Sequence, residues 1–248
     1  MNSNVWRLIP VIDAPGRVQM AIDRWLLAQH QHHGHPPTLR FYTWNPPAIS
    51  LGVSQRGKVP QHWHHLTWRG TPLELVQRPS GGRGVLHQGD LTYGVVASHI
   101  PGNLDQVYRA ICQFLIEGWR FLGVDLRFGK PDRQYLRSQN CFGLATNADL
   151  IDVEGNKFIG SAQLKQGRCF LQHGSMLLKS DPDLFHKVFH CAPPPPPHRQ
   201  GGRLSELTIP EIVEALTSAA QRCFHCHFLD RPLSPIEWQD IKSKAALT

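Results

Sequence analysis

A glycine-rich stretch at residues 78–87, Arg-Pro-Ser-Gly-Gly-Arg-Gly-Val-Leu-His, carries side chains that could bind and polarise a ligand. Its glycines let the backbone adopt positive φ angles and approach a ligand closely, and Arg78, Arg83 and His87 supply hydrogen-bond donors around the turn. The stretch continues to Tyr93 and an apolar run at 94–97. We therefore predict a ligand-facing loop between two strands, although a purely structural turn fits these residues alone equally well.

Two familiar phosphate-binding patterns do not fit this loop. The dinucleotide-binding fingerprint has a third glycine at the position that His87 occupies, and a P-loop ends in Gly-Lys-Ser or Gly-Lys-Thr, which this stretch lacks. The loop must therefore serve a different ligand, or none.

Cys141, within Gln-Asn-Cys-Phe-Gly at 139–143, is a candidate nucleophile because an ionised thiol attacks acyl groups readily. Taken alone, a single cysteine before a phenylalanine is more often a small packed hydrophobe. The chain has six cysteines and no signal-peptide pattern, so we expect free thiols rather than disulfides. Cys223 and Cys226 have the spacing of half a zinc site or a redox pair, but no second pair follows them, which favours a structural role.

Two histidine clusters, at 30–35 and 62–65, are candidate metal ligands because imidazole binds metals readily. No cysteine or carboxylate accompanies either cluster at the spacing of a structural zinc site. We therefore interpret both as solvated loops and expect no metal.

The composition is that of an ordinary soluble globular protein, with 41% hydrophobic and 18% charged residues among 248, a length that suits one domain spanning 1–248. The first residues do not resemble a signal peptide and no run is long enough to cross a bilayer, so we expect a cytoplasmic protein without membrane contact. The formal net charge of +7 suits an acidic protein partner or a nucleic acid. No face interleaves aromatic and basic residues, which disfavours the nucleic acid.

The elements that must position these residues follow from periodicity. Apolar spacing predicts helices over 17–29 and 103–122, the second with Gly123 as its C-cap, and capping boxes at 208–211 and 234–237 predict two more. Alternation predicts strands at 38–44, 124–128, 149–153, 157–164 and 169–178, and a return strand at 48–52. Residues 130–140 are expected to form a polar surface loop. The proline-rich stretch 193–203 is expected to be a stiff surface connection within the domain rather than a ligand of an SH3 domain.

Several segments of this chain resemble the family of lipoate-protein ligase A and the octanoyltransferases. They are Met20-Ala-Ile-Asp23, the run from Leu39 to Gly52, the glycine-rich loop with Leu91-Thr-Tyr93, Lys157-Phe-Ile-Gly-Ser-Ala162, and Gln172-His-Gly-Ser175. Together they span most of residues 5–230. The resemblance implies the biotin/lipoate A/B protein ligase fold, an α/β (α+β) domain with a mixed sheet flanked by helices.

The resemblance also implies which residues form the site. In that family the glycine-rich loop lines the site of the lipoyl or octanoyl chain, and the lysine that matches Lys157 contacts the activated acyl carbonyl. Cys141 and Lys157 are then catalytic. The implied substrate-binding residues are Arg40, Arg78, Ser80, Gly81, Gly82, Arg83, His87, Tyr93, Gly160, Ser161, Ala162, His173 and Gly174. For Arg40, the strand pattern alone suggests instead a surface charge on an edge strand.

The chain is most similar to the octanoyltransferase (LipM-like) branch, in which a cysteine in an Asn/Ala-Cys-Phe segment shortly before the lysine accepts the acyl group. Cys141 matches that cysteine, and Gly-Gly-Arg at 81–83 agrees with the same branch. The chain departs from the pattern at Gly84, Gln88 and Asp90, where alanine, aspartate and glutamate are usual, and it lacks the proline common after the cysteine. These departures bear on the substrate more than on the fold.

The implied reaction attaches an octanoyl (or lipoyl) group to the lysine of a lipoyl-domain protein. Octanoyl-acyl carrier protein is the donor of the octanoyl group, and a Cys141 thioester is the intermediate. The acceptor would be the glycine cleavage H protein or a 2-oxoacid dehydrogenase E2, and no cofactor is needed. Lys157 would favour the thiolate of Cys141 and stabilise the oxyanion. The alternatives are an ATP- and Mg-dependent lipoate-protein ligase that works through lipoyl-AMP, and a non-catalytic basic binding module.

Overall fold

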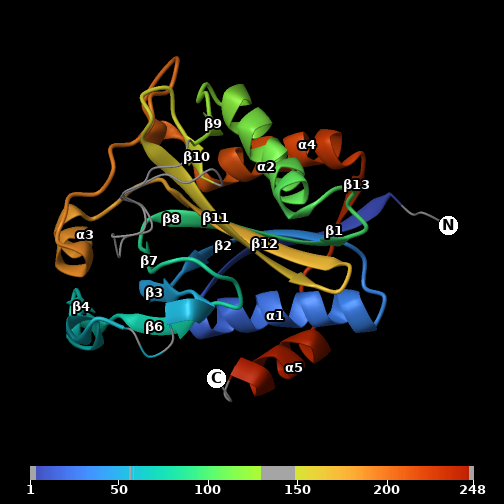
Figure 1. The fold of residues 1–248 in the computed structure, drawn as a ribbon, viewed down its shortest axis with the longest axis horizontal. Helices are drawn as coiled ribbons and strands as arrows, with labels where there is room; N and C mark the ends of the chain where they lie inside the picture. The colour runs from blue at the N-terminus through green and yellow to red at the C-terminus, as the bar shows by residue number, and fades with distance from the viewer. Residues whose placement is uncertain (1–3, 56, 58, 130–148, 246–248) are drawn as a thin grey trace.

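The computed structural model describes residues 4–55, 57, 59–129 and 149–245 (Figure 1). Its centre is an eight-stranded sheet in the order β13-β1-β2-β8-β12-β11-β10-β9. The strands are β1 (Val5–Ala14), β2 (Thr38–Trp44), β8 (Asp90–Ser98), β9 (Arg127–Phe128), β10 (Leu150–Ile151), β11 (Lys157–Gln166), β12 (Cys169–Leu177) and β13 (His227–Asp230). β1 runs parallel to β13 and β2, and the remaining neighbours pair antiparallel. The predicted mixed sheet is thus confirmed.

The predicted meander from residue 149 is present as β10, β11 and β12, and Lys157 begins β11 as expected. The strand predicted at 124–128 is shorter than predicted. Only Arg127 and Phe128 pair with the sheet, because the amide of Val124 bonds back to the carbonyl of Trp119 at the end of the preceding helix.

A second, three-stranded sheet contains β6 (Glu74–Gln77), β3 (Ala48–Leu51) and β7 (Val85–His87), and β4 (Thr67–Trp68) pairs with β5 (Thr71–Pro72). The stretch 48–52 was predicted to be a return strand beside 38–44, and this prediction is wrong. Both edges of β2 are already occupied by β1 and β8, so β3 pairs with β6 and β7 instead. The glycine-rich loop therefore connects β6 to β7 at the side of the main sheet.

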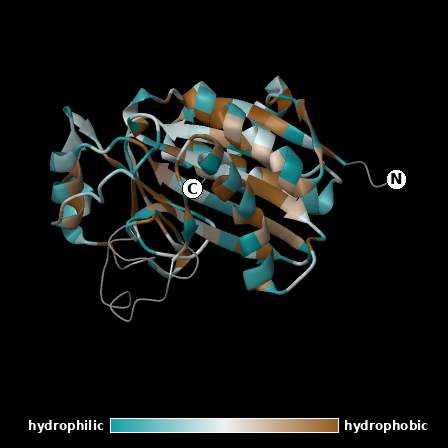
Figure 2. Cartoon of the chain, turned by 90° about the horizontal axis from the view of Figure 1, so that it is seen from above, coloured by the Kyte–Doolittle hydropathy of each residue, from teal (hydrophilic) through white to brown (hydrophobic). Residues whose placement is uncertain are grey.

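Helices cover both faces of the main sheet (Figure 1). They are α1 (Gly16–His32), α2 (Leu104–Phe121), α3 (Pro182–Phe189), α4 (Ile209–Phe224) and α5 (Pro235–Ala245). α2 packs with α4 on one face and α1 packs with α5 on the other. Hydrophobic and hydrophilic residues alternate along the helices, as expected of amphipathic elements that cover a sheet (Figure 2). The predicted capping boxes at Thr208 and Ser234 are present.

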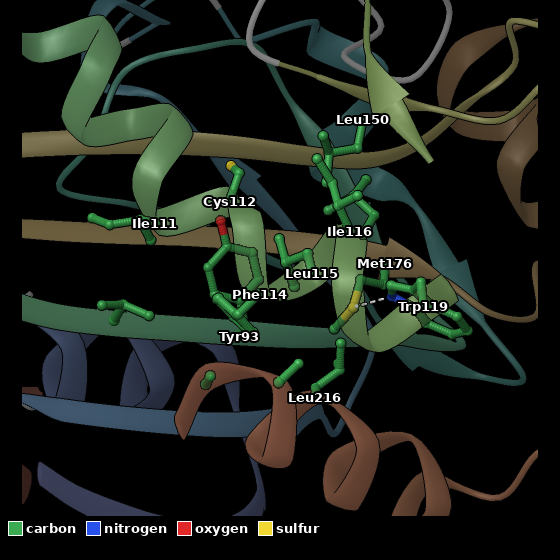
Figure 3. Close-up of a cluster of buried hydrophobic side chains, with 14 of the residues drawn as sticks. Tyr93, Ile111, Cys112, Phe114, Leu115, Ile116, Trp119, Leu150, Met176 and Leu216 are labelled. Atoms are coloured by element: carbon green, nitrogen blue, oxygen red, sulfur yellow. Dashed lines mark hydrogen bonds between the residues drawn. The ribbon is translucent and has the colours of Figure 1, made fainter. Parts of the chain in front are cut away.

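The core beneath α2 holds the sheet in register beside the site described below (Figure 3). Ile111, Leu115 and Trp119 lie on the buried face of α2 at helical spacing. The indole N–H of Trp119 points at the sulfur of Met176 on β12, 3.4 Å away, and Phe114 meets the ring of Tyr93 on β8 edge-on, with centroids 5.5 Å apart. These contacts fix where β8 and β12 present their polar side chains.

The two histidine clusters do not form the loops that were predicted. α1 continues to His32 rather than ending near Gln29, so the first cluster begins inside its last turn, and residues 61–65 form a short 3-10 helix. Trp63 within that helix is buried and donates to the carbonyl of Val188, which anchors the segment. Among the described residues, no group of three or more His, Cys, Asp or Glu side chains is arranged to hold a metal ion. Nor does any helix in the described ranges have the length and apolar character needed to cross a bilayer.

Arg7 on β1 and Glu237 on α5 form a clamp that joins opposite parts of the chain. The guanidinium makes two contacts with the carboxylate, at 2.8 and 2.9 Å, and also donates to the carbonyls of Arg231 and Pro232. Burial raises the pKa of Glu237, but Arg7 and the amide of Ser234 outweigh it and lower the pKa from 4.5 to about 2. The clamp thus ties α5, which packs on α1, to β1.

Glu237→Gln should lower the free energy of unfolding at pH 7 by about 2–3 kcal/mol, because it leaves the buried Arg7 without its counter-charge. A carboxyl whose folded pKa is depressed stabilises the protein above its unfolded pKa, and that stabilisation is lost as the pH falls through the folded pKa. The difference between wild type and variant should therefore shrink as the pH falls from 4.5 towards 2. Urea unfolding across this range measures it, with Glu214→Gln on the exposed face of α4 as the control.

Candidate active site

A cavity of about 320 Å³ lies between the glycine-rich loop (residues 78–84), β2, and the facing strands β11 and β12. Its size is that of a small-molecule site. It is lined by Met20, Tyr42, Trp44, Ser50, Arg78, Gly81, Gly82, Val85, His87, Thr92, Tyr108, Asp149, Lys157, Gly160, Ser161, Ala162, Gln163, His173, Gly174 and Ser175. Side chains of α1, β2 and β7 supply apolar and aromatic surface, and the strands opposite supply polar groups.

Lys157 places a buried positive charge in the wall of this cavity. Its Nζ lies 2.9 Å from Oδ1 of Asp149, and both side chains are at most 5% exposed. Removing a charge pair from water costs free energy, and the attraction between the charges offsets this cost only when their geometry and further contacts are good. Lys157 is therefore a buried, specifically placed charge and not a solvated surface residue. A Cβ at Gly160 would lie 3.0 Å from Cε of Lys157. Glycine at that position therefore leaves room for the lysine, which explains the Lys-x-x-Gly spacing.

The floor of the cavity depends on close contact between β8, β11 and β12. The hydroxyl of Tyr93 donates to Oγ of Ser161 at 2.8 Å, and the amide of Gln172 donates to the Tyr93 hydroxyl at 3.2 Å. A Cβ at Gly174 would lie 2.6 Å from the Tyr93 ring, so any larger residue would push β12 away. Tyr93 thus sets the spacing of the strands that carry Ser161 and His173.

One buried hydrogen-bonded chain links α1 to the glycine-rich loop. Oδ2 of Asp23 lies 2.7 Å from Nδ1 of His173, and Nε2 of His173 lies 2.5 Å from Oγ of Ser80. Arg40 stands behind Asp23, with its Nε 3.0 Å from Oδ1. Burial raises the pKa of Asp23, but Arg40 and His173 outweigh it and hold the pKa below its usual range. An ionised Asp23 orients His173 with Nδ1–H toward the carboxylate and Nε2 toward Ser80.

A second chain runs along the other side of the loop. Nη1 of Arg78 donates to Oγ of Ser50 at 3.2 Å, so the single hydroxyl hydrogen of Ser50 points to Nε2 of His87, 2.8 Å away. Nδ1 of His87 then donates to Asp90 at 2.8 Å. Burial lowers the pKa of His87 despite the carboxylate. His87 is therefore a neutral imidazole of fixed orientation, stacked on Trp44 with ring centroids 3.7 Å apart.

Arg78 also shapes the loop itself. Its guanidinium donates to the carbonyls of Ser50, Gly81 and Arg83 at 2.6–3.0 Å. Gly82 has φ = +95°, a conformation that favours glycine. The arginine therefore holds the loop closed around its own side chain while it lines the cavity.

The structure brings ten of the predicted site residues to the cavity wall. They are Arg78, Gly81, Gly82, His87, Lys157, Gly160, Ser161, Ala162, His173 and Gly174. Ser80 and Tyr93 lie one layer behind, bonded to His173 and Ser161. Arg83 contributes the carbonyl that accepts from Arg78. Cys141 lies outside the described residues.

Arg40 is neither on an edge strand nor at the surface. It is 1% exposed on β2, between β1 and β8, so the interpretation as a surface charge is wrong. Arg40 does not line the cavity. It acts on the site through its ion pair with Asp23, and its guanidinium also lies 3.8 Å from the centre of the Tyr42 ring.

Other residues of the site were not singled out from the sequence. Asp149 could have been suspected as a carboxylate at the start of the strand predicted at 149–153; in the structure it directly precedes β10, which pairs with the strand of Lys157. Trp44 and Met20 lie in segments that carried the family resemblance but gave no separate signal. Tyr108 shows only helical spacing, and its hydroxyl donates to the carbonyl of Ser161.

This arrangement suits a ligand with an apolar chain and a polar reacting end. The apolar wall of Met20, Tyr42 and Trp44 can hold the chain, and the ammonium of Lys157 can stabilise a negative charge that develops at a carbonyl oxygen. Two oriented imidazoles flank the same space. The geometry therefore supports acyl chemistry.

Comparison with known proteins agrees with this chemistry. Residues 15–218 match the model of the lipoyl protein ligase A/B catalytic domain. The octanoyltransferase LipM of Anoxybacillus flavithermus is 40% identical over 200 residues, covering 76% of this chain and 71% of the relative, and that of Geobacillus kaustophilus gives the same figures. The fold is similar to that of a lipoate-protein ligase A bound with ATP, with a TM-score of 0.76, 21% identity, and 99% and 95% of the two chains covered.

Proposed function

Since this chain belongs to the lipoyl protein ligase A/B catalytic domain family and is an octanoyl-transferring enzyme within it, we propose that it works through a covalent intermediate. The enzyme takes the octanoyl group from octanoyl-acyl carrier protein and holds it as a thioester on Cys141. It then passes the group to the lysine of a lipoyl-domain protein, and it uses no ATP.

The observation that carries this proposal is the buried ammonium of Lys157 in the wall of a cavity with a largely apolar far side. An acyl chain fits the apolar side, and its carbonyl then faces the ammonium. The 40% identity to octanoyltransferases supports transfer of an octanoyl group. The role of Cys141 rests on the segment around it, Gln-Asn-Cys-Phe-Gly at 139–143, and on its position before Lys157 in the sequence.

The reaction needs only groups of this chain and of its two substrates. The Cys141 thiolate attacks the donor thioester, the carbon–sulfur bond of the donor breaks, and the carrier thiolate leaves with the electron pair. The acceptor lysine, as its neutral amine, then attacks the Cys141 thioester, an amide forms as the carbon–sulfur bond breaks, and the proton that the amine loses passes to the departing Cys141 sulfur. In both steps the carbonyl oxygen becomes negative, and one preorganised donor such as Lys157 contributes about 3 kcal/mol to such a transition state.

Intact-mass spectrometry of the protein after mixing with octanoyl-acyl carrier protein, without ATP, tests the proposal. The protein should gain the mass of one octanoyl group, and a lipoyl-domain protein added afterwards should remove it. A protein that stays unmodified with the thioester, but lipoylates its acceptor with ATP and lipoate, would be a lipoate-protein ligase.

Added salt should slow the transfer from octanoyl-acyl carrier protein when that donor is limiting. The chain carries a net charge of +7, and carrier proteins and lipoyl domains are acidic, so their encounter is accelerated by attraction over the Debye length. This length falls from about 10 Å at 0.1 M salt to about 3 Å at 1 M. Initial rates across that range measure the effect, and octanoyl-pantetheine, which has no charged protein surface, is the control. An equal response of both donors would exclude electrostatic steering.

A further inference from the structure

A second cavity, of about 600 Å³, also reaches Lys157. It lies between the end of β12, the start of α3 and the proline-rich segment 193–197. Besides Lys157 it is lined by the basic side chains of Lys179, His198, Arg199 and Arg203, and no carboxylate is among its described lining residues. We call this cavity the basic groove. Lys157 lines both the basic groove and the cavity of about 320 Å³ in the candidate active site, so the two cavities share the residue that we expect to face the acyl carbonyl.

We propose that the basic groove binds the 4′-phosphopantetheine arm of the acyl carrier protein, which goes beyond the proposed function and rests on it. This arm ends in the thioester and begins at a phosphodiester. Lys179 and Arg203 are exposed and can pair with the phosphodiester, while the thioester end reaches Lys157. Arg199 contributes less, because its guanidinium is held by the carbonyl of Leu122 and lies 3.7 Å from Glu206.

The walls of the groove suit the middle of such an arm. Residues 191–199 form no helix or strand, and the five consecutive prolines at 193–197 favour an extended conformation in which carbonyl oxygens do not bond within the segment. Phe158, Leu177 and Leu204 supply apolar surface beside them. Pantetheine carries two amide N–H groups, which carbonyls can accept, and a dimethyl group, which apolar side chains can cover.

The charge of the groove also separates the two substrates of the reaction. An acceptor lysine approaches as an ammonium, which a groove lined by basic side chains repels, whereas a phosphodiester is attracted. The donor arm therefore enters by the basic groove, and the acceptor lysine approaches the acyl-enzyme by another route.

Binding of the arm without its acyl group tests the groove independently of any transfer. Calorimetric titration with 4′-phosphopantetheine and with pantetheine should show about tenfold tighter binding of the phosphorylated compound, since each partly exposed ion pair contributes a factor of a few. Lys179→Glu combined with Arg203→Glu should remove this preference. Arg168→Glu combined with Lys242→Glu makes the same change in net charge at exposed positions outside the groove, and should retain it.

The two half-reactions provide a second test. The double variant in the groove should slow formation of the acyl-enzyme from octanoyl-acyl carrier protein about tenfold, and leave transfer from a preformed acyl-enzyme to the acceptor unchanged. Slowing of the second step alone would show that the groove serves the acceptor, and would overturn the proposal. Faster acylation from octanoyl-coenzyme A, which carries the same arm, would overturn the assignment to a carrier protein.

The two proposals fail in different ways. Phosphate-dependent binding in the groove without any octanoyl adduct would leave the groove assigned and remove the covalent mechanism. An octanoyl adduct that forms equally well from phosphorylated and unphosphorylated octanoyl-pantetheine would support the covalent mechanism and remove the assignment of the groove.

Discussion

Cys141→Ala should acquire no octanoyl mass from octanoyl-acyl carrier protein, and its transfer rate should fall by about 10⁴-fold or more, as is typical when a covalent nucleophile is removed. The buried cysteines Cys112 and Cys226 are poor substitutes. Burial raises the pKa of Cys112 to about 12 and that of Cys226 to about 11, so few of these thiols ionise at neutral pH. Single-turnover kinetics with intact-mass detection measure both effects.

Cys191→Ala is the matched control, because Cys191 is the exposed cysteine among the described residues. It should acquire the octanoyl group like the wild type. Both variants should melt at the temperature of the wild type, which separates loss of chemistry from loss of fold. Full transfer by Cys141→Ala, or transfer that appears only with ATP, would contradict the thioester mechanism.

Lys157→Met should slow formation of the acyl-enzyme by about 10²-fold or more, because it removes one preorganised donor from the developing oxyanion while it retains most of the side-chain volume. It also removes the counter-charge beside Asp149, which should destabilise the protein by about 3 kcal/mol. Rapid-quench measurement of acylation and urea unfolding report these two effects separately.

Adding Asp149→Asn to Lys157→Met should restore much of the stability, because the asparagine side chain is neutral and needs no counter-charge. It should not restore the acylation rate, because the double variant still has no ammonium to stabilise the oxyanion at the acyl carbonyl. Lys165→Met changes an exposed lysine of the same strand and should affect neither quantity. An acylation rate in the double variant equal to that of the wild type would exclude Lys157 from the chemistry.

The polar site could be predicted from sequence where its residues are close in the chain. The turns at 154–156 and 166–168 separate alternating segments, so the position of Lys157 at the start of a strand followed from local pattern. Gly160 and Gly174 belong to short motifs that carry the family resemblance. The chains of buried hydrogen bonds could not be predicted in this way, because Asp23 and His173 are 150 residues apart and meet only through sheet order.

Arg40 shows a second limit of prediction from sequence, which concerns burial. Alternation along 38–44 predicts one buried and one exposed face, but α1 covers the face on which Arg40 lies, and nearly all of β2 is buried. A buried arginine then needs a carboxylate from another element, which Asp23 provides. The catalytic role of Cys141 stays a prediction from sequence, since it lies outside the described residues.

The clamp between Arg7 and Glu237 has a consequence for synthesis on the ribosome, because its two halves are 230 residues apart. At about 5–20 residues per second, β1 leaves the ribosome roughly 10–50 s before α5 does. During that interval β1 can pair with β2, but the edge that β13 will occupy is open, and open edges recruit other strands. Nascent chains arrested before residue 227 should therefore bind chaperones that recognise exposed strands, and release them once 227–245 emerge.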